Sequence, residues 1–367
     1  MSEILKTEEF LMNMGPQHPA THGVLRLVLT MNGEVVVKAI PHVGYLHRST
    51  EKILENREYI QIIPYLDRMD YLAAMCNELP YVLAIEKLME IDVPERAQTI
   101  RIIVFELNRI VSHVMWWGNF GLELGAFTPM LYGFREREEG LNLFEYISGQ
   151  RMTYNYMRIG GVARDLPDDF SERTKNYLKI IKEKLKDYDG LLTENIIFQQ
   201  RTKNIGIIPR ETAINYALSG PMLRGSGVKW DIRKGEPYCS YENYDFEIPT
   251  GETGDVFDRY MVRYNEIIQS TRIVEQALEK LKPGEFQAKV PKKITPKGEI
   301  YFRVETPRGE MGIYLVSNGT SKPYRFKVRA ASFCNLSIAE EVMKECYMAD
   351  LPAIIGSIDF ILGDVDR

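Results

Sequence analysis

Residues Arg101 to Trp117 read RIIVFELNRIVSHVMWW, and this segment decides the fold that the sequence predicts. Its apolar residues recur at spacings of three and four, so they fall on most sides of a helix. A helix of this kind belongs in the centre of a bundle. Just before it, Pro94 suits a first helical turn and Glu95 suits the positive end of the helix dipole. The sequence therefore predicts a central helix that runs from about residue 93 to Trp117.

Further helices are predicted on both sides of this segment. From Pro41 to about residue 91, helical spacing is punctuated by Pro64 and Pro80. After the central helix we expect a mixed loop, GNFGLELGAFTP, over residues 118–129. Helices are then predicted over 130–156, 171–192 and 255–281. The stretch SGPMLRGSG, residues 219–227, is expected to be a glycine-rich turn, and it lacks the spacing of a dinucleotide-binding motif.

Two β-rich regions flank the helices. Residues 24–40 contain two β-branched segments around Asn32-Gly33, which is a strong hairpin signal. Residues 299–331 alternate like strands, with breaks at TPRG and SNGTSKP, and follow an exposed basic linker over 289–297. We therefore expect a helix-rich α+β fold, integrated as one domain. Its parts are an N-terminal β-hairpin region (1–45), a helical core (46–285) and a C-terminal β-ribbon region with the tail (286–367).

Composition excludes several classes of protein. A net charge of −5 over 367 residues argues against a nucleic-acid partner. No apolar run reaches the ~18 residues of a membrane span, and the acidic N-terminus does not resemble a signal peptide. We expect an intracellular protein whose membrane contact is peripheral. The four cysteines form no C-x-x-C pair, so neither a zinc ribbon nor an iron–sulfur cluster held by this chain is predicted.

The histidines are gathered near the N-terminus. Four of the five lie within the first 47 residues, and two of them, His18 and His22, fall in the turn MGPQHPATHGVLR of residues 14–26. Its prolines and glycines fix an unusual backbone shape just before a strand. The residues alone allow two interpretations: a structural turn whose histidines satisfy local hydrogen bonds, or a functional site.

Seven motifs distributed along the chain together resemble the D-subunit family of respiratory complex I, the proton-pumping NADH:quinone oxidoreductase. The resemblance covers about residues 13–367. The motifs are GPQHPATHGVLRL (15–27), GYLHRSTEK (44–52), DRMDYLAAMCNE (67–78), GAFTP (125–129), RIGGV (158–162), SGPMLRGSG (219–227) and GDVDR (363–367).

That family is itself similar to the large subunit of nickel–iron hydrogenases, which implies a hydrogenase-like helical core. Those hydrogenases bind nickel and iron through two C-x-x-C pairs. In this chain Asp70 and Ala73 stand where the first pair would be, and Ile361 and Asp364 stand where the second would be. Because a soft metal site needs thiolates, we expect no metal here and exclude hydrogen chemistry.

The resemblance implies a quinone-reduction site and assigns residues to it. His22 and Tyr71 match the residues that contact the two carbonyls of the quinone headgroup. Glu123 stands where relatives carry an acidic partner for that histidine, often an aspartate. From the residues alone, Tyr71 would be a core tyrosine and Glu123 a solvated carboxylate. The other histidines, His42, His47 and His113, are interpreted as structural.

Two arginines match residues near the terminal iron–sulfur cluster of the family. Arg48 and Arg68 would lie beside that 4Fe–4S cluster, which the B subunit binds. Thr153 departs from the family, because many relatives carry a histidine there. The missing titratable ring bears on the pH coupling of the cluster's potential and favours a low-potential quinone such as menaquinone over ubiquinone.

These residue types suit quinone chemistry. Reduction of a quinone to a quinol adds two electrons and two protons, so each carbonyl oxygen needs a nearby donor. Histidine titrates near neutral pH, a phenol can donate and accept, and a carboxylate beside the imidazole favours its charged form. The chain would supply the pocket and protons but no redox centre of its own.

We therefore expect a peripheral subunit of an energy-converting NADH:quinone oxidoreductase, active only in the assembled complex. It would contact the B, C, I and H subunits on the cytoplasmic side of a prokaryotic inner membrane and couple quinone reduction to proton translocation, while NADH reacts elsewhere in the complex. Three alternatives stay open: a hydrogenase-type enzyme, a structural scaffold that docks its neighbours, and a relative fed by ferredoxin or F420H2.

Overall fold

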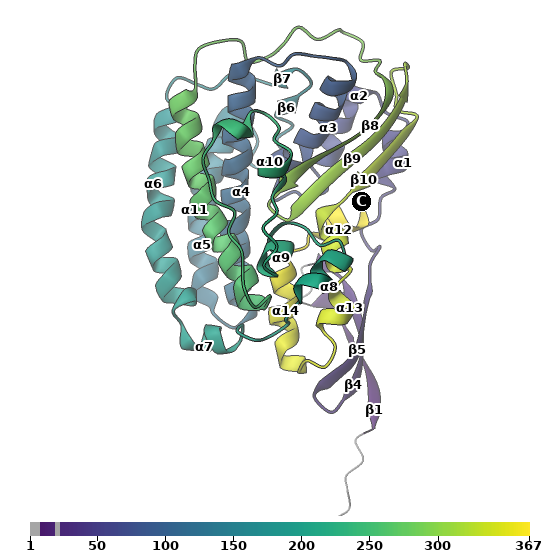
Figure 1. The fold of residues 1–367 in the computed structure, drawn as a ribbon, viewed down its shortest axis with the longest axis vertical. Coiled ribbons are helices and arrows are strands. Elements are labelled where there is room, and N and C mark those ends of the chain that lie inside the picture. Colours follow the sequence, from purple (N-terminus) through teal and green to yellow (C-terminus); the bar gives the residue numbers. More distant parts are fainter. Residues whose placement is uncertain (1–7, 19–22) are drawn as a thin grey trace, which may run out of the picture.

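The long helices form a bundle around one central helix (Figure 1). The structure, a computed structural model, describes residues 8–18 and 23–367. Helix α4 (Glu95–Glu123) packs along both α5 (Phe127–Ser148) and α11 (Val256–Lys280), and α6 (Phe170–Tyr188) lies outside them. The predicted central helix is thus confirmed, and most of its residues are buried.

The expected loop over residues 118–129 is wrong in its first half, because α4 continues to Glu123. Its glycines are contact points between helices. A Cβ atom on Gly118 would lie 3.1 Å from the Cα atom of Met130 on α5, and one on Gly133 would lie 2.9 Å from the carbonyl oxygen of Val114. Helix α5 begins at Phe127 and ends at Ser148, earlier than the predicted residue 156.

Shorter helices complete the core. Pro64 and Pro80 lie inside α2 (Tyr59–Leu66) and α3 (Ala74–Leu88) instead of between helices. Their neighbours Ile63 and Leu79 are buried, so packing offsets the hydrogen bond that each proline lacks. The turn predicted at 219–227 contains a buried helical segment, α9 (Gly220–Gly225). The remaining short elements are α1 (Thr50–Leu54), η2 (Asp189–Thr193), α7 (Ile196–Gln200), α8 (Arg210–Asn215), α10 (Ile232–Gly235), η3 (Tyr241–Asn243), α12 (Ala331–Leu336), α13 (Ala339–Val342), η4 (Met348–Asp350), α14 (Leu351–Ile358) and α15 (Leu362–Asp366).

Two antiparallel three-stranded sheets flank the helices, as the sequence predicts. The N-terminal sheet has the order β1–β4–β5, with β1 (Glu9–Met14), β4 (Arg26–Asn32) and β5 (Val35–His42). Asn32 pairs with Val35, so the hairpin turns at Gly33-Glu34, and β1 is a strand that the sequence analysis missed. The C-terminal sheet has the order β10–β9–β8, with β8 (Lys297–Thr306), β9 (Gly309–Asn318) and β10 (Arg325–Arg329).

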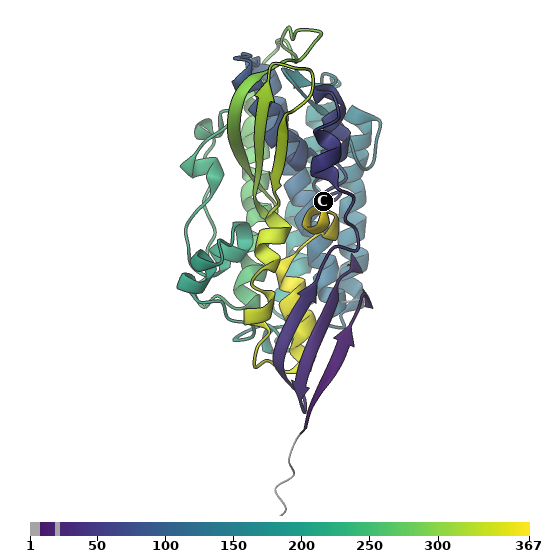
Figure 2. The same cartoon turned by 90° about the vertical axis from the view of Figure 1, so that its right-hand side faces the viewer.

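The C-terminal end of the chain lies between the two sheets (Figure 2). Two short strand pairs, β2 (Gln17–His18) with β3 (Gly23–Val24) and β6 (Met157–Arg158) with β7 (Gly161–Val162), complete the described strands. Among the residues described, no helix combines the length and apolar character that crossing a bilayer requires. The architecture is a helix-rich α+β fold, which confirms the predicted fold class.

Candidate functional site

The two segments that correspond to the hydrogenase metal motifs lie against each other. The first, residues 67–73, joins α2 to α3, and the second, residues 357–364, joins α14 to α15. A Cβ atom on Gly363 would lie 2.6 Å from the carbonyl oxygen of Met69. Segments almost 300 residues apart in sequence thus meet, and Asp70 of one segment and Asp364 of the other interact electrostatically.

Arg308 lies between these segments and cross-links them. It comes from the tight turn between β8 and β9, and its guanidinium is buried. One terminal nitrogen donates to Asp70 Oδ2 over 2.6 Å and to Ser112 Oγ over 3.1 Å, and the other lies 3.4 Å from Asp359 Oδ1. In the sequence TPRG is only a break between strands, where an arginine is ordinarily exposed.

Three carboxylates are buried in this site, and a buried carboxylate is costly to keep charged unless it is paired. Asp70, Asp359 and Asp364 are buried, and the guanidiniums of Arg308 and Arg263 lie among them. Burial, helped by the charges of the other two aspartates, raises the pKa of Asp70 to about 6 against the pull of Arg308. Burial also raises the pKa of Asp364.

Tyr71 stands at the rim of this cluster. Its residue is 40% exposed whereas the adjacent Asp70 is 2% exposed, so the chain passes from interior to surface between them. Partial burial and the nearby carboxylate of Asp70 raise the pKa of the phenol, with Arg308 opposing them. The phenol therefore stays protonated at neutral pH and can donate a hydrogen bond or a proton to a molecule that reaches it from outside.

Glu123 is the last residue of α4 and does not lie in a loop, which corrects the sequence-based expectation. It is half-buried, and its carboxylate packs against α14: a Cβ atom on Gly356 would lie 1.9 Å from Glu123 Oε2. His22, its expected partner, lies outside the described residues. The neighbouring Gly23 lies beside α15, because a Cβ atom there would be 3.1 Å from Leu362 Cδ1.

Arg68 and Thr153 lie in one pocket. Together with Arg158 and Arg164 they help to line a cavity of about 460 Å³ at the end of α2. Arg68 is exposed and donates to the carbonyl oxygen of Pro64 over 2.6 Å. Arg68, which is predicted to face the cluster, therefore lines the same pocket as Thr153, which stands in place of the expected histidine.

Arg48 does not line that pocket but lies in a loop that the C-terminus holds. Asp366 accepts the backbone N–H groups of Gly44 and Leu46, each over 2.7 Å. The carbonyl oxygen of Asp366 accepts the Nδ1–H of His47 over 2.6 Å, and that of Arg367 accepts the backbone N–H of Arg48. The terminal motif GDVDR thus fixes the shape of the motif GYLHRSTEK.

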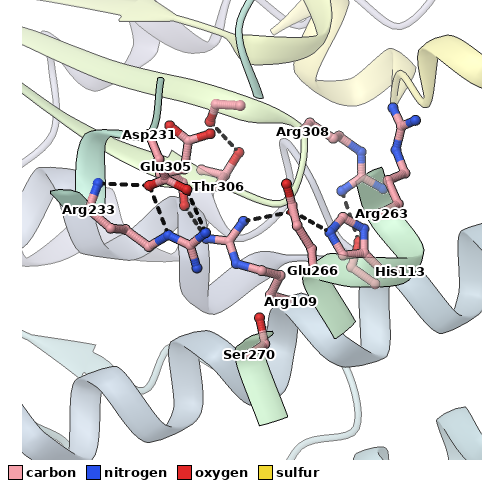
Figure 3. A network of polar contacts seen from close by, with 12 residues as sticks. Arg109, His113, Asp231, Arg233, Arg263, Glu266, Ser270, Glu305, Thr306 and Arg308 are labelled. Atoms are coloured by element: carbon pink, nitrogen blue, oxygen red, sulfur yellow. Dashed lines mark hydrogen bonds and ion pairs between the residues drawn. The ribbon is translucent and has the colours of Figure 1, made fainter. Parts of the chain in front are cut away.

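A second buried polar network runs between α4 and α11 (Figure 3). Glu266 bonds to His113 Nε2 over 2.8 Å and to Arg224 over 2.6 Å, and Arg224 continues to Glu305 over 2.7 Å. Burial would raise the pKa of Glu266, but Arg224 and His113 hold it well below its usual value. Burial lowers the pKa of His113, so its neutral ring donates to Glu266. This arrangement suits the structural role expected of His113.

The described residues hold no group of three or more histidine, cysteine or acidic side chains placed to bind a metal ion. The four cysteines are free thiols, of which Cys76 and Cys239 are buried. The described part of the site offers the rim phenol of Tyr71, the buried aspartates and the arginines, which can exchange protons and stabilise charge.

Comparison with known proteins places the whole chain in one group. The family described as "Respiratory-chain NADH dehydrogenase, 49 Kd subunit" matches residues 123–296 and 286–367. The chain is 53% identical to the D subunit of the NADH-quinone oxidoreductase of Desulforamulus reducens, over 99% of both chains. It is 51% identical to the D subunit from Geobacillus kaustophilus, over 99% of this chain and 100% of the other, and 49% identical to that from Geotalea uraniireducens, over 98% and 99%.

Proposed function

Because the chain belongs to the family of the 49-kDa subunit of respiratory-chain NADH dehydrogenase, and so is a subunit of an NADH-quinone oxidoreductase complex, we propose that it forms the quinone-reduction pocket of that complex. The observation that carries the proposal is the rim position of Tyr71. A protonated phenol, open to an incoming molecule, stands on a buried charged cluster where the two emptied metal motifs meet.

The reaction needs two electrons and two protons at the quinone. Tyr71 donates to one carbonyl oxygen of the headgroup and His22 to the other, since a phenol and an imidazole are the donors that this chemistry requires. The carboxylate of Glu123 favours the imidazolium form of His22, which can then donate a proton to the quinone. The end of α4 at Glu123 borders Gly356, and Gly23 borders Leu362 of the same C-terminal segment, which suits a pocket between them.

Electrons come from outside this chain. Arg48 and Arg68 would supply fixed positive charge beside a 4Fe–4S cluster of the B subunit, which would provide the electrons. The cavity that Arg68 shares with Thr153 supports this position. The C, I and H subunits are the further neighbours, on the cytoplasmic side of the inner membrane. Protonation changes at His22 and Tyr71 drive charge movement into the membrane arm, so quinone reduction is coupled to proton translocation.

Substitution of the two donors tests this proposal. Tyr71→Phe and His22→Gln should each lower quinone reductase activity of the assembled complex by about 10²-fold or more, the usual loss on removal of a general acid. Tyr216→Phe is the matched control, because Tyr216 is a similarly exposed tyrosine (38%) at the end of α8 that is not among the residues proposed for the site.

Assembly is verified by NADH oxidation with an artificial electron acceptor that does not use the quinone site. Unchanged quinone reductase activity in both variants, with assembly intact, would contradict the proposal. The chain would then be a structural scaffold, with quinone reduced elsewhere.

A further inference from the structure

The buried cluster next to Tyr71 contains three carboxylates but only two guanidiniums. A cross-link that is purely structural does not need the third carboxylate. We propose that Asp70 is a second functional acid of the site, which returns a proton to Tyr71 after the phenol has donated its own. Arg308, Asp359 and Asp364 form the cluster that holds this proton. This inference rests on the proposed role of Tyr71 in quinone reduction.

Asp70 is the residue before Tyr71 and lies on the buried side of the loop that carries the phenol. Its Oδ1 accepts the backbone N–H groups of Leu72 and Ala73 over 3.2 and 3.3 Å, and its Oδ2 accepts from Arg308 over 2.6 Å. The carboxyl group is thus fixed by its own loop while Tyr71 projects from that loop toward the surface. Burial raises the pKa of the Tyr71 phenol, the charge of Asp70 raises it too, and that of Arg308 lowers it.

The balance of charge favours one stored proton. Three buried carboxylates face the two guanidiniums of Arg308 and Arg263, so full ionisation would leave a negative charge in a nearly dry volume. Burying an unpaired charge is costly, and coupled carboxylates relieve the cost by sharing a proton. Asp364 Oδ1 supports this, because it is buried and has no hydrogen-bond partner in the described structure.

The other arginines around the cluster act on carboxylates outside it. Arg259 donates to Ser357 Oγ over 2.9 Å, and its charge is attracted by Asp255 and Asp258. Arg367 acts on Asp364, but its guanidinium also pairs with Glu51 at 3.6 Å. Arg109 acts on Cys76, a buried thiol on which Asp70 also acts, and donates to Glu106 in the second network. Burial raises the pKa of Cys76 well above its usual value, so the thiol is neutral.

The proton transfer balances without a further reagent. The quinone receives two electrons from the donor chain of the complex, and the O–H bond of Tyr71 breaks as one quinone oxygen gains its proton. The resulting phenolate takes the proton of Asp70: the O–H bond of the carboxylic acid breaks and that of the phenol forms again. The carboxylate of Asp70 then takes a proton from a hydronium ion of the solvent: an O–H bond of that ion breaks as the O–H bond of the acid forms, and water is released. The transfer from Asp70 to a phenolate is downhill, because a carboxylic acid is a much stronger acid than a phenol.

A purely structural role predicts a different pattern of mutant effects. If Arg308 and its aspartates only join the two motifs, loss of Asp70 distorts the site equally whether or not Tyr71 can donate a proton. If Asp70 acts through Tyr71, its loss matters only when the phenol is present. A double-mutant cycle separates these cases.

The experiment measures quinone reductase activity of the assembled complex with Asp70→Asn, Tyr71→Phe and both substitutions together. We expect Asp70→Asn to lower activity about tenfold beside Tyr71 but less than about twofold beside Phe at position 71. Asp231→Asn is the matched control, because Asp231 is equally buried and pairs with Arg233 over 2.6 Å in the other network. It should change activity by the same factor in both backgrounds.

Each outcome decides a separate claim. Tyr71→Phe without effect would overturn the proposed role of Tyr71 and this inference with it, and the same result in His22→Gln would overturn the proposed function. A loss with Tyr71→Phe, together with an Asp70→Asn factor that is equal in both backgrounds, would overturn this inference and leave the proposed function standing. Should Asp70→Asn prevent assembly, the same cycle with Asp359→Asn decides by the same criterion.

Discussion

At the scale of single residues, Arg308 explains how two segments far apart in the sequence are held together. Its guanidinium joins Asp70 of the first segment to Asp359 of the second. Because this arginine is buried with carboxylates on both sides, its removal should cost far more stability than the loss of a surface ion pair.

Replacement of Arg308 by methionine should therefore destabilise the protein strongly. The variant leaves buried carboxylates without their cation, which typically costs ~3–5 kcal/mol. Arg303→Met is the control, since Arg303 pairs with Glu236 and Glu310 on a partly exposed strand and its loss should cost ~1 kcal/mol or less. The thermal unfolding midpoint of this protein in the complex measures both, and equal shifts would contradict the role given to Arg308.

His113 should make stability fall at acid pH. Burial lowers its pKa below the ordinary value of 6.5. Below pH 6.5 the unfolded chain therefore binds a proton that the folded chain excludes, and stability is lost as pH decreases. In His113→Gln, whose amide can still donate to Glu266, the drop in thermal midpoint from pH 7 to pH 5 should be smaller than in the original protein. His42→Gln, at an exposed position, should leave the drop unchanged. Identical drops in all three proteins would refute the prediction.

At the scale of elements, periodicity predicts the long helices and both hairpin regions but misjudges glycines and prolines. The sequence predicts a loop from Gly118 onward, because glycine disfavours helices in isolation. In the structure Gly118 allows α5 to approach closely, a tertiary effect that local sequence does not contain. Pro80 lies inside α3 for a similar reason: the residues on both sides of it are buried, and this packing outweighs the low helix propensity of proline.

The contact between the terminal motif and the loop of residues 44–48 gives a prediction at this scale. Asp366→Ala removes the acceptors of the Gly44 and Leu46 N–H groups, and a hydrogen bond to a charged acceptor contributes ~1.5–3 kcal/mol. Hydrogen exchange across residues 44–48 should accelerate by at least about tenfold, as followed by mass spectrometry. Asp350→Ala is the control, because Asp350 pairs with Arg201 and does not contact this loop. Unchanged exchange in Asp366→Ala would show that other contacts hold the loop.

At the scale of the whole molecule, the sequence predicts the fold class and, through the family resemblance, the candidate site residues. It could not predict that Arg308 joins the two motifs, because no periodicity relates a strand turn to segments so far away in the chain. Nor could it predict the exposure of Tyr71 beside the buried Asp70, which depends on how α15 covers the first motif. His22 is named by the motif alone, since it lies outside the described residues.

The most direct test of the central claim is a density map of the assembled complex with a quinone analogue bound. The account predicts the headgroup between His22 and Tyr71, with one carbonyl oxygen within about 3 Å of the phenol oxygen and the other within reach of the imidazole. A headgroup bound elsewhere, with Tyr71 covered by a neighbouring protein of the complex, would contradict it.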